Sequence, residues 1–572
     1  MTPGSQSRSK LFDLLPALYR IKDAQVAAAQ QLPMGPLESL LTLVEEQLAV
    51  VENDLEQLYD DQFIETCAPW VIPYIGDLIG YQPVYGVAPA VASPRAEVAH
   101  TISFRRRKGT VLALEQLARD VTGWGAHAVE FFQLLVGTQY MKHVRPLNFY
   151  APDLRSWQVG AYLDMAFDGT AHLIDVRRIA AQRGRYNIPN IGIFLWSLNA
   201  YSLSLVPLTA SGTNSAGQAQ CFRFSPLGRD IPLFTNPVSQ GSQLTTAAVP
   251  VNVPAPLLRR VLCEDLQSGA GAAYYGEGKS LVLKLGGQIL NPYQIQVCDL
   301  SGQDGSWINL PTSADNYPYS AAIDPELGRL ALPPSAGLKI PEATFYYGFN
   351  ADMAGGEYAR EQGFLVEGEV LPFPDTSASA RYTTLQEALD FAASQLSPQG
   401  QIAVELNGSG VSQPAYQPGA QLSINVPAGA AMEIRGAEGS WPTLILNGGI
   451  TVSGGASSSL VLNGLLVTSS VAPGQPSGTP PVALVQVPVA APDGSNNQLG
   501  SLTIKDCTLV PGWVLAPNGA PEYGDAPALA AAPAQLQIVV QRSIVGGLQI
   551  EEFVQASLTD SILDATSSSN IA

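Results

Sequence analysis

The most regular alternation of apolar and polar residues in the chain lies between residues 37 and 61. Its apolar positions follow one another at alternating steps of four and three residues, the heptad pattern of a helix that packs lengthwise against other helices. These seven positions, which we call the seam, are Leu37, Leu41, Val44, Leu48, Val51, Leu55 and Leu58. Taking 41, 48 and 55 as heptad position a leaves two valines among the d positions. Leucine at a with β-branched residues at d favours assemblies of three or more helices.

The segment that carries the seam contains no basic residue. Its flanking e and g positions include Glu45, Glu52, Asp54 and Asp61, so two copies of this helix would bring like charges together. A different chain with basic flanks is therefore the expected partner. The alternative is an internal helical bundle in which the basic cluster at residues 105–108 supplies the opposite charge.

Three further helices are predicted, over residues 70–79, 95–108 and 110–121. The first has apolar residues at helical spacing and stops at Gly80. Thr110 is a suitable N-cap for the last helix, and Gly123 is a suitable end. Residues 1–126 are therefore predicted to form a helical bundle domain.

Beyond residue 127 the pattern changes to short alternating runs with frequent glycine and proline, such as SLVLKL at 280–285. Such runs predict a β-rich region over 127–260 and a β-sandwich-like domain over 261–370. A capping box of Thr384 with Glu387 then predicts a short amphipathic helix, and only strands and turns follow it. The expected fold class is multidomain α+β.

The strands after residue 450 repeat. The stretches around Leu462, Ile504, Val540 and Leu558 share one pattern and are spaced by 42, 36 and 18 residues. We interpret 18 residues as one coil, 36 as two, and 42 as two with a proline-rich insertion, which predicts a parallel β-helix over 371–572. The repeat is still in register at Ile562. An uncovered last coil would expose a strand edge. We therefore expect that a partner subunit or a further stretch of the same polypeptide covers Ile562, or that the β-helix is incomplete here and continues in a longer gene product.

Composition narrows the function classes. Acidic residues outnumber basic ones 49 to 30 over 572 residues, which argues against binding to duplex nucleic acid. The five cysteines are odd in number and form no CxxC pair, a usage typical of reduced intracellular thiols. The first ten residues lack the apolar core of a signal peptide, and polar residues interrupt the most apolar later run, at 191–208. These features predict a cytoplasmic protein without a transmembrane segment.

Candidate catalytic groups are few. The four histidines, at 100, 127, 143 and 172, show no zinc-ligand spacing, and nucleophile-elbow, phosphate-loop and dinucleotide motifs are missing from the sequence. Asp506, Asp560 and Asp564 have the chemistry of the carboxylate pair of a polysaccharide-cleaving β-helix, but aspartate at a solenoid turn is commoner for backbone reasons. The sequence therefore predicts a protein that is not an enzyme and that has no cofactor and no metal site.

Several stretches of the chain resemble a known family. Those that resemble tail protein I of contractile phages are LFDLLPALYR from residue 11, FIETCAPWVIPYIGDLIGY from 63 and FRRRKGT from 104. Those that resemble its homologues in phage-tail-like contractile injection systems are RGRYNIPNIGIFLW from 183, FRFSPLGRDIPLF from 222 and ADMAGGEYAR from 351. The phrases CTLVPGW, SIVGGLQI and LTDSILDA, from 507, 543 and 558, resemble the C-terminal part of long members.

The resemblance implies a structural baseplate wedge subunit. In that family one copy joins two copies of a baseplate J-like protein through a helical bundle, and six wedges close around the tail hub. The seam would line this bundle, and Trp70 with Tyr74 would hold the next helix beneath it. The role of the C-terminal region stays open between a peripheral strut, a fibre mount and a contact with membrane or sheath. The alternatives are a receptor- or glycan-binding tailspike-like β-helix protein and a glycan-cleaving enzyme.

Overall fold

The computed structural model describes residues 10–30, 32, 34–82, 94–136, 141–143, 155–178, 184–213, 220–241, 244–311, 319–336, 339–365, 369–375, 380–410, 421–470, 483–492 and 494–566. Both helices and sheets are present, which confirms the α+β class. The chain divides into two compact units. The helical unit comprises Met1–Gln133, Ile174–Leu195 and Gly241–Ala247, and the sheet unit comprises Leu134–Leu173, Trp196–Gln240 and Ala248–Ala572. The domain boundaries expected at residues 126, 260 and 370 stay predictions.

The described part of the helical unit contains the four helices expected from the sequence, preceded by two helices for which no bounds were predicted. They are α1 (Lys10–Asp13), α2 (Ala17–Gln30), α3 (Pro36–Asp60), α4 (Ile72–Leu78), α5 (Pro94–Arg106) and α6 (Val111–Thr122), followed by the paired strands β1 (Gly125–Glu130) and β2 (Ile191–Trp196). The predicted caps of α6 are confirmed. The side chain of Thr110 accepts a hydrogen bond from the main-chain N–H of Ala113, and Gly123 ends the helix with a φ of 70°.

A side chain of the preceding helix caps α3. The carboxylate of Asp23 on α2 accepts hydrogen bonds from the main-chain N–H groups of Leu37 and Glu38, at 2.9 and 3.1 Å. These are two of the donors that the first turn of a helix leaves without an intrahelical acceptor. Gly35 leaves the necessary room, because a Cβ there would lie 1.9 Å from the Asp23 carboxylate.

We expect Asp23→Ala to lower the stability of the α2–α3 contact by about 1 kcal/mol, because both donors lose their acceptor. Hydrogen exchange of the amides at 37 and 38 measures the effect directly, with faster exchange as the expected result. Asp54→Ala is the control, since Asp54 is exposed in the middle of the same helix. Unchanged protection at both amides in Asp23→Ala would contradict this account of the cap.

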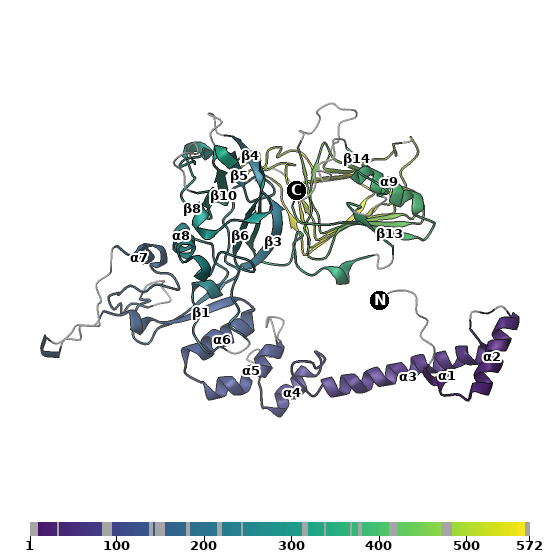
Figure 1. Cartoon of the computed structure of the whole chain (residues 1–572), viewed down its shortest axis with the longest axis horizontal. Coiled ribbons are helices and arrows are strands. Elements are labelled where there is room, and N and C mark those ends of the chain that lie inside the picture. Colours follow the sequence, from purple (N-terminus) through teal and green to yellow (C-terminus); the bar gives the residue numbers. More distant parts are fainter. Residues whose placement is uncertain are drawn as a thin grey trace. The chain divides into compact units, whose positions relative to one another are not determined.

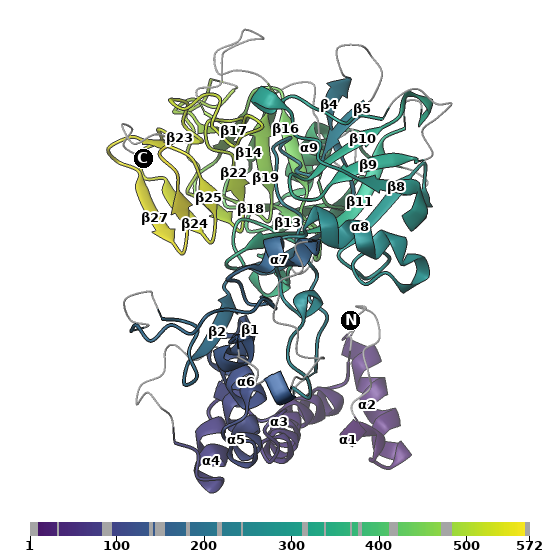
Figure 2. The same cartoon turned by 90° about the vertical axis from the view of Figure 1, so that its left-hand side faces the viewer.

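The sheet unit begins with two sheets of mainly antiparallel strands (Figures 1 and 2). One has the order β4 (Thr209–Thr213), β5 (Gln220–Arg223), β10 (Arg329–Leu332), β9 (Ala321–Asp324) and β8 (Ile295–Val297). The other has the order β3 (Asn199–Pro207), β11 (Pro341–Phe349), β6 (Leu281–Leu285) and β7 (Gln288–Ile289). Both sheets combine strands from either side of residue 260. Their side chains form one apolar core, in which the rings of Phe224 and Phe345 lie 5.1 Å apart. The helices α7 (Trp157–Tyr162) and α8 (Arg259–Gln267) also belong to this unit.

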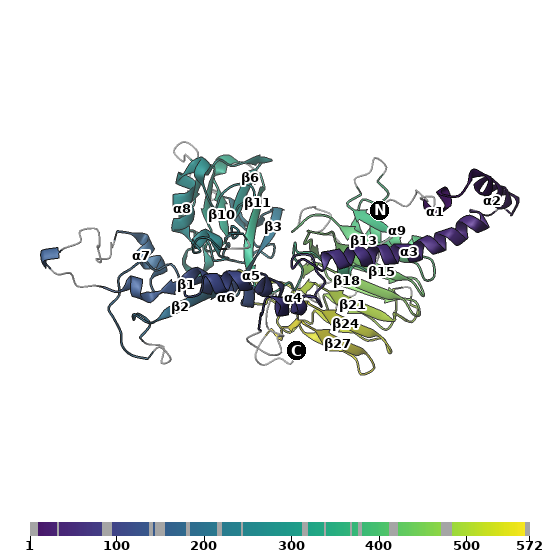
Figure 3. The same cartoon turned by 90° about the horizontal axis from the view of Figure 1, so that it is seen from below.

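Three parallel sheets form the rest of this unit. The seven-stranded sheet contains β12 (Val370–Phe373), β13 (Gln401–Leu406), β15 (Ala431–Gly436), β18 (Ser459–Asn463), β21 (Ser501–Lys505), β24 (Gln537–Gln541) and β27 (Gln555–Thr559). The second sheet contains β14 (Leu422–Val426), β17 (Ile450–Gly454), β20 (Val485–Val487), β23 (Leu529–Ala531) and β26 (Leu548–Ile550). The third sheet contains β16 (Thr443–Leu446), β19 (Leu466–Ser469), β22 (Thr508–Leu509), β25 (Ile544–Val545) and β28 (Ile562–Leu563). From β15 onward the chain visits the three sheets in strict rotation, and Figure 3 shows the strands of the first sheet stacked in chain order.

The short helix that the sequence predicted lies between the strands β12 and β13. Helix α9 (Leu385–Gln395) starts at the capping box: Thr384 accepts from the N–H of Glu387, and the Glu387 carboxylate accepts from the N–H of Thr384. Its buried face contributes to the same apolar core as the parallel strands. That face consists of Leu385, Ala388, Leu389 and Ala392.

The predicted repeat positions are neighbours in the seven-stranded sheet. Leu462 pairs with Ile504, Ile504 with Val540, and Val540 with Leu558. This register confirms the alignment but corrects the counting of coils. Each of the 42-, 36- and 18-residue intervals is a single circuit through the three sheets. The extra residues lie in connections between strands, such as 510–528 between β22 and β23, because a loop can lengthen without changing the pairing on either side.

A left-handed residue follows each repeat position two residues later. Gly464, Asp506, Arg542 and Asp560 have φ values of 69°, 50°, 44° and 49°. This conformation turns the chain from the seven-stranded sheet toward the sheet that contains β19, β22, β25 and β28. Residues other than glycine adopt it at a cost in free energy. At Gly464 a side chain has no room, since a Cβ would lie 1.1 Å from a guanidinium nitrogen of Arg360.

The helices of the described ranges are too short or too polar to cross a lipid bilayer. All five cysteines are free thiols. Burial raises the pKa of Cys507 to about 12, so this thiol stays protonated at neutral pH.

Candidate functional site

The seam runs along α3, and most of it is open to solvent. Figure 1 shows α3 as a long helix with α1 and α2 beside its N-terminal part. Leu37 and Leu41, in that part, are half-buried. The other five seam residues are exposed: Val44 by 49%, Leu48 by 43%, Val51 by 53%, Leu55 by 62% and Leu58 by 63%. A continuous exposed apolar row of this length is typical of a surface that binds another protein.

The charged side chains of α3 are all acidic. The basic cluster at 105–108 does not neutralise them in the part of the chain that the structure describes. Arg105 donates to the main-chain oxygens of Ile79 and Gly80, at 2.7 and 2.5 Å. Arg107 donates to the main-chain oxygen of Leu244 at 2.6 Å and to the hydroxyl of Ser103. These two arginines therefore tie neighbouring segments to α5, and α3 keeps its negative charge.

Trp70 and Tyr74 lie next to each other at the start of α4. Their ring centroids are 6.2 Å apart in an edge-to-face arrangement. The two side chains are 67% and 65% exposed. The small core of this region uses other residues, namely Cys67, Val71, Ile72 and Val98. The structure thus brings the two predicted interface aromatics together on the surface, and their role beneath a partner helix stays a prediction.

His100, His127 and His172 each contact a carboxylate. The contacts are His100 Nδ1 to Asp120 Oδ2 at 2.7 Å, His127 Nδ1 to Glu115 Oε2 at 3.1 Å and His172 Nε2 to Asp168 Oδ2 at 2.7 Å. Each carboxylate is largely buried. A buried carboxylate beside an imidazole satisfies the hydrogen-bonding needs of both groups, so these pairs have a structural explanation.

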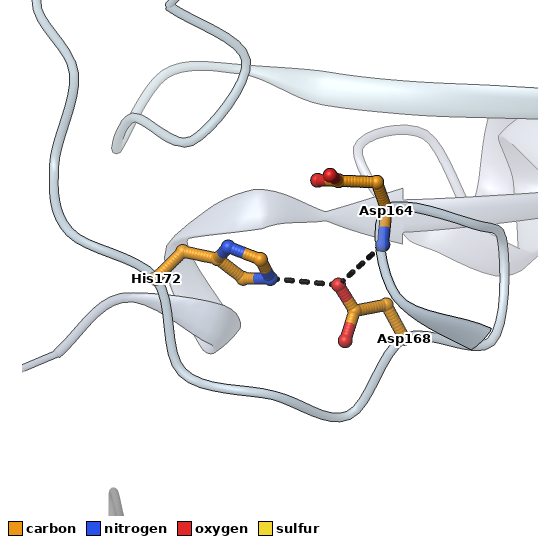
Figure 4. A group of neighbouring side chains, drawn as sticks. All are labelled: Asp164, Asp168 and His172. Atoms are coloured by element: carbon orange, nitrogen blue, oxygen red, sulfur yellow. Dashed lines mark hydrogen bonds and ion pairs between the residues drawn. The ribbon is translucent and has the colours of Figure 1, made fainter. Parts of the chain in front are cut away.

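The third pair belongs to a group that has the composition of a metal site (Figure 4). One ligand atom from each of Asp164, Asp168 and His172 lies within 4.8 Å of the others. However, the Asp168 carboxylate already accepts hydrogen bonds from the Thr170 N–H and hydroxyl, from the main-chain N–H of Asp164 and from His172. Burial by itself would raise the pKa of Asp168, but these hydrogen bonds outweigh it and lower the pKa. The geometry is that of a satisfied loop network, and we assign no metal to it.

The three candidate aspartates of the parallel sheets lie at turns. Asp506 and Asp560 are two of the left-handed turn residues. Asp506 also pairs with Arg542 at 2.7 Å. Asp564 accepts a hydrogen bond from the main-chain N–H of Thr566 at 2.8 Å. Each has a backbone or ion-pair function that accounts for an acidic residue at its position.

One group of residues escaped the sequence analysis. Tyr201, Tyr347, Tyr358 and Trp441 lie around a cavity in the sheet unit. Burial, followed by a hydrogen bond to Asp352, raises the pKa of Tyr201 to about 12. These rings come from positions up to 240 residues apart in the sequence. No local pattern in the sequence marks them.

Within the described residues the geometry therefore offers a surface suited to a protein partner, the seam, and a cavity suited to a small ligand. The comparisons with protein-family models, with curated proteins and with solved structures give no match.

Proposed function

We propose that this chain is a structural baseplate wedge subunit of a contractile injection system, of the tail protein I type. The observation that carries the proposal is the exposed seam on an acidic helix. Exposure of five consecutive apolar residues to water is unfavourable, and their burial in a helical bundle is favourable. The resemblance of the N-terminal stretches to tail protein I supports the same assignment.

The proposed partner is a baseplate J-like chain. Because α3 carries only acidic charge, its bundle partners need basic flanks beside an apolar stripe of their own. The resemblance implies two J-like copies for each copy of this chain, with six such wedges around the tail hub and contacts to the sheath. We place the assembly of this chain into a phage-tail-like particle in the cytoplasm, with release of the particle and docking on a membrane as the alternatives for its later location.

For the C-terminal region we propose a parallel β-helix that acts as a rigid strut at the wedge periphery. The rotation of the chain through three parallel sheets supports this architecture. Such a stack can carry load or mount a fibre without a catalytic site, because each circuit is supported by its neighbours. Contact of this strut with a fibre, a membrane or the sheath remains an alternative outcome.

The wedge assignment is tested by co-expression of this chain with a baseplate J-like chain from the organism that produces it. Native mass spectrometry should then detect a stable complex with one copy of this chain and two of the partner. A particle-associated chain that binds no such partner, or a purified chain that forms only homotrimers, would favour a tailspike instead.

We also expect the purified protein to leave polysaccharides and peptidoglycan intact. The reason is that Asp506, Asp560 and Asp564 serve as turn or ion-pair residues. Release of reducing ends is the appropriate assay. Turnover that disappears in Asp560→Asn while the fold is retained would make the protein an enzyme and refute the structural assignment of this region.

A further inference from the structure

The sheet unit contains a cavity of about 250 Å³. One side is formed by Leu466, Thr508 and Ile544, which occupy matching positions on the adjacent strands β19, β22 and β25. The facing side comes from β3 and β11, and the segment 351–358 closes part of the wall. The cavity is thus built where the antiparallel strands lie against the third parallel sheet.

Aromatic rings line much of the cavity. The ring of Tyr347 lies 5.9 Å from that of Tyr201 and 5.7 Å from that of Trp441, and the ring of Tyr358 lies 6.0 Å from that of Tyr201. The hydroxyl of Tyr201 is occupied by a hydrogen bond of 2.7 Å to Asp352. These contacts hold the rings in fixed positions along the cavity wall.

Most polar groups of the lining already have partners. The Thr508 hydroxyl donates to the main-chain oxygen of Ala354 at 2.7 Å. The Ser225 hydroxyl accepts from the N–H of Leu227 at 3.3 Å. Two lining groups lack a partner among the described residues: the indole N–H of Trp441 has no acceptor, and the guanidinium of Arg229 takes part in no hydrogen bond or ion pair. The site therefore combines apolar walls with a single unpaired cation.

This combination selects one chemical class. A sugar would bury several hydroxyl groups against walls that offer few partners, and each unpaired hydroxyl costs about 1–3 kcal/mol. A ligand with one anionic group and an otherwise apolar body leaves no such groups unpaired. A guanidinium also matches a carboxylate with two parallel hydrogen bonds.

We propose that the cavity binds an apolar carboxylate, with its hydrocarbon part against Tyr347, Trp441 and Ile544 and its carboxylate on Arg229. The site is independent of the wedge assignment, because none of its residues belongs to the helical unit. Octanoate is a suitable probe, and 1-octanol provides the same chain without the charge.

Isothermal titration of the full chain with both probes tests the proposal. Octanoate should bind saturably, and Arg229→Gln should weaken it by about tenfold or more while leaving 1-octanol unchanged. Arg229 is exposed, so this variant should keep its fold. Arg260→Gln, an exposed arginine outside the cavity, is the matched control and should leave both affinities at the wild-type value.

A second variant tests the location. Leu227→Trp, at a half-buried position of the cavity wall, should abolish binding of both probes, with an unchanged unfolding midpoint as the check on folding. The proposal is overturned if wild-type protein binds no octanoate at millimolar concentration, or if binding survives Leu227→Trp. If Leu227→Trp blocks both probes but Arg229→Gln leaves octanoate unaffected, the carboxylate assignment is wrong.

Discussion

The double substitution Leu48→Lys with Val51→Lys should abolish assembly of contractile particles while the sheet unit stays folded. Full burial of a Val or Leu side chain contributes about 1.5–3 kcal/mol, and about half of the surface of each of five seam residues is exposed. Burial of this exposed part in a bundle thus stabilises the bundle by roughly 4–8 kcal/mol per copy of the chain. Two ammonium groups at adjacent a and d positions remove part of this gain and add the cost of burying charge.

Electron microscopy of particles from the native producer measures the result, and circular dichroism of the purified full chain reports its fold. The control is Ala49→Lys with Asn53→Lys, which adds the same charge to exposed positions of α3 outside the seam. This control separates loss of apolar contact from a change in the helix's acidic charge. Intact particles from the seam variant, or loss of particles in the control, would argue against the seam as the wedge interface.

Asp230→Ala should destabilise the sheet unit by about 3–5 kcal/mol, because it leaves two largely buried arginines unpaired. Arg223 and Arg329 stand directly opposite each other on β5 and β10. The Asp230 carboxylate accepts hydrogen bonds from Arg223 Nε at 2.8 Å, from Arg329 Nε at 2.9 Å and from Arg329 Nη2 at 2.6 Å. Both guanidinium groups also lie near the ring of Trp307, at 5.4 and 4.8 Å from its centroid.

Denaturant unfolding, followed by the β-sheet signal in circular dichroism, measures this loss of stability. Glu522→Ala, which removes an exposed carboxylate, is the control and should change stability by less than about 0.5 kcal/mol. A loss in Asp230→Ala no larger than that of the control would show that the cations remain solvated or find other acceptors.

The same carboxylate makes stability depend on pH. Burial alone would raise the pKa of Asp230, but its bonds to Arg329 and Arg223 outweigh burial and lower it below 3.8. A carboxylate with a lowered pKa in the folded state stabilises the fold fully above its unfolded pKa. That contribution is lost as the pH falls through the folded pKa, so the acid-induced loss of stability below about pH 4 should be smaller in Asp230→Ala than in wild type.

The local elements of this protein follow from patterns that short stretches of sequence contain. The helical period of the seam and the caps at Thr110 and Thr384 depend on residues close in sequence, and the repeat position of Leu462 depends on a pattern that recurs along the chain. Such signals need no knowledge of the rest of the fold, because helix caps are local and a stacked repeat places equivalent residues side by side. The alignment of four repeat positions therefore predicted their pairing in one sheet.

The number of coils could not be predicted in this way. A connection between strands changes the spacing of the repeat without changing its register, so 36 residues appeared as two coils where the chain makes one circuit. Spacing alone does not distinguish a long loop from an additional turn of strands.

Tertiary structure alone decided the contacts between distant residues. The cap of α3 by Asp23, the bridge of Asp230 to Arg329, and the cavity that joins Tyr201 to Trp441 each unite side chains whose separation in sequence follows no period. A carboxylate or an aromatic ring has the same letter in the sequence whether it faces water or a buried partner. Only the packing of the sheets fixes which neighbour it meets, and with it the charge balance and the chemistry of the site.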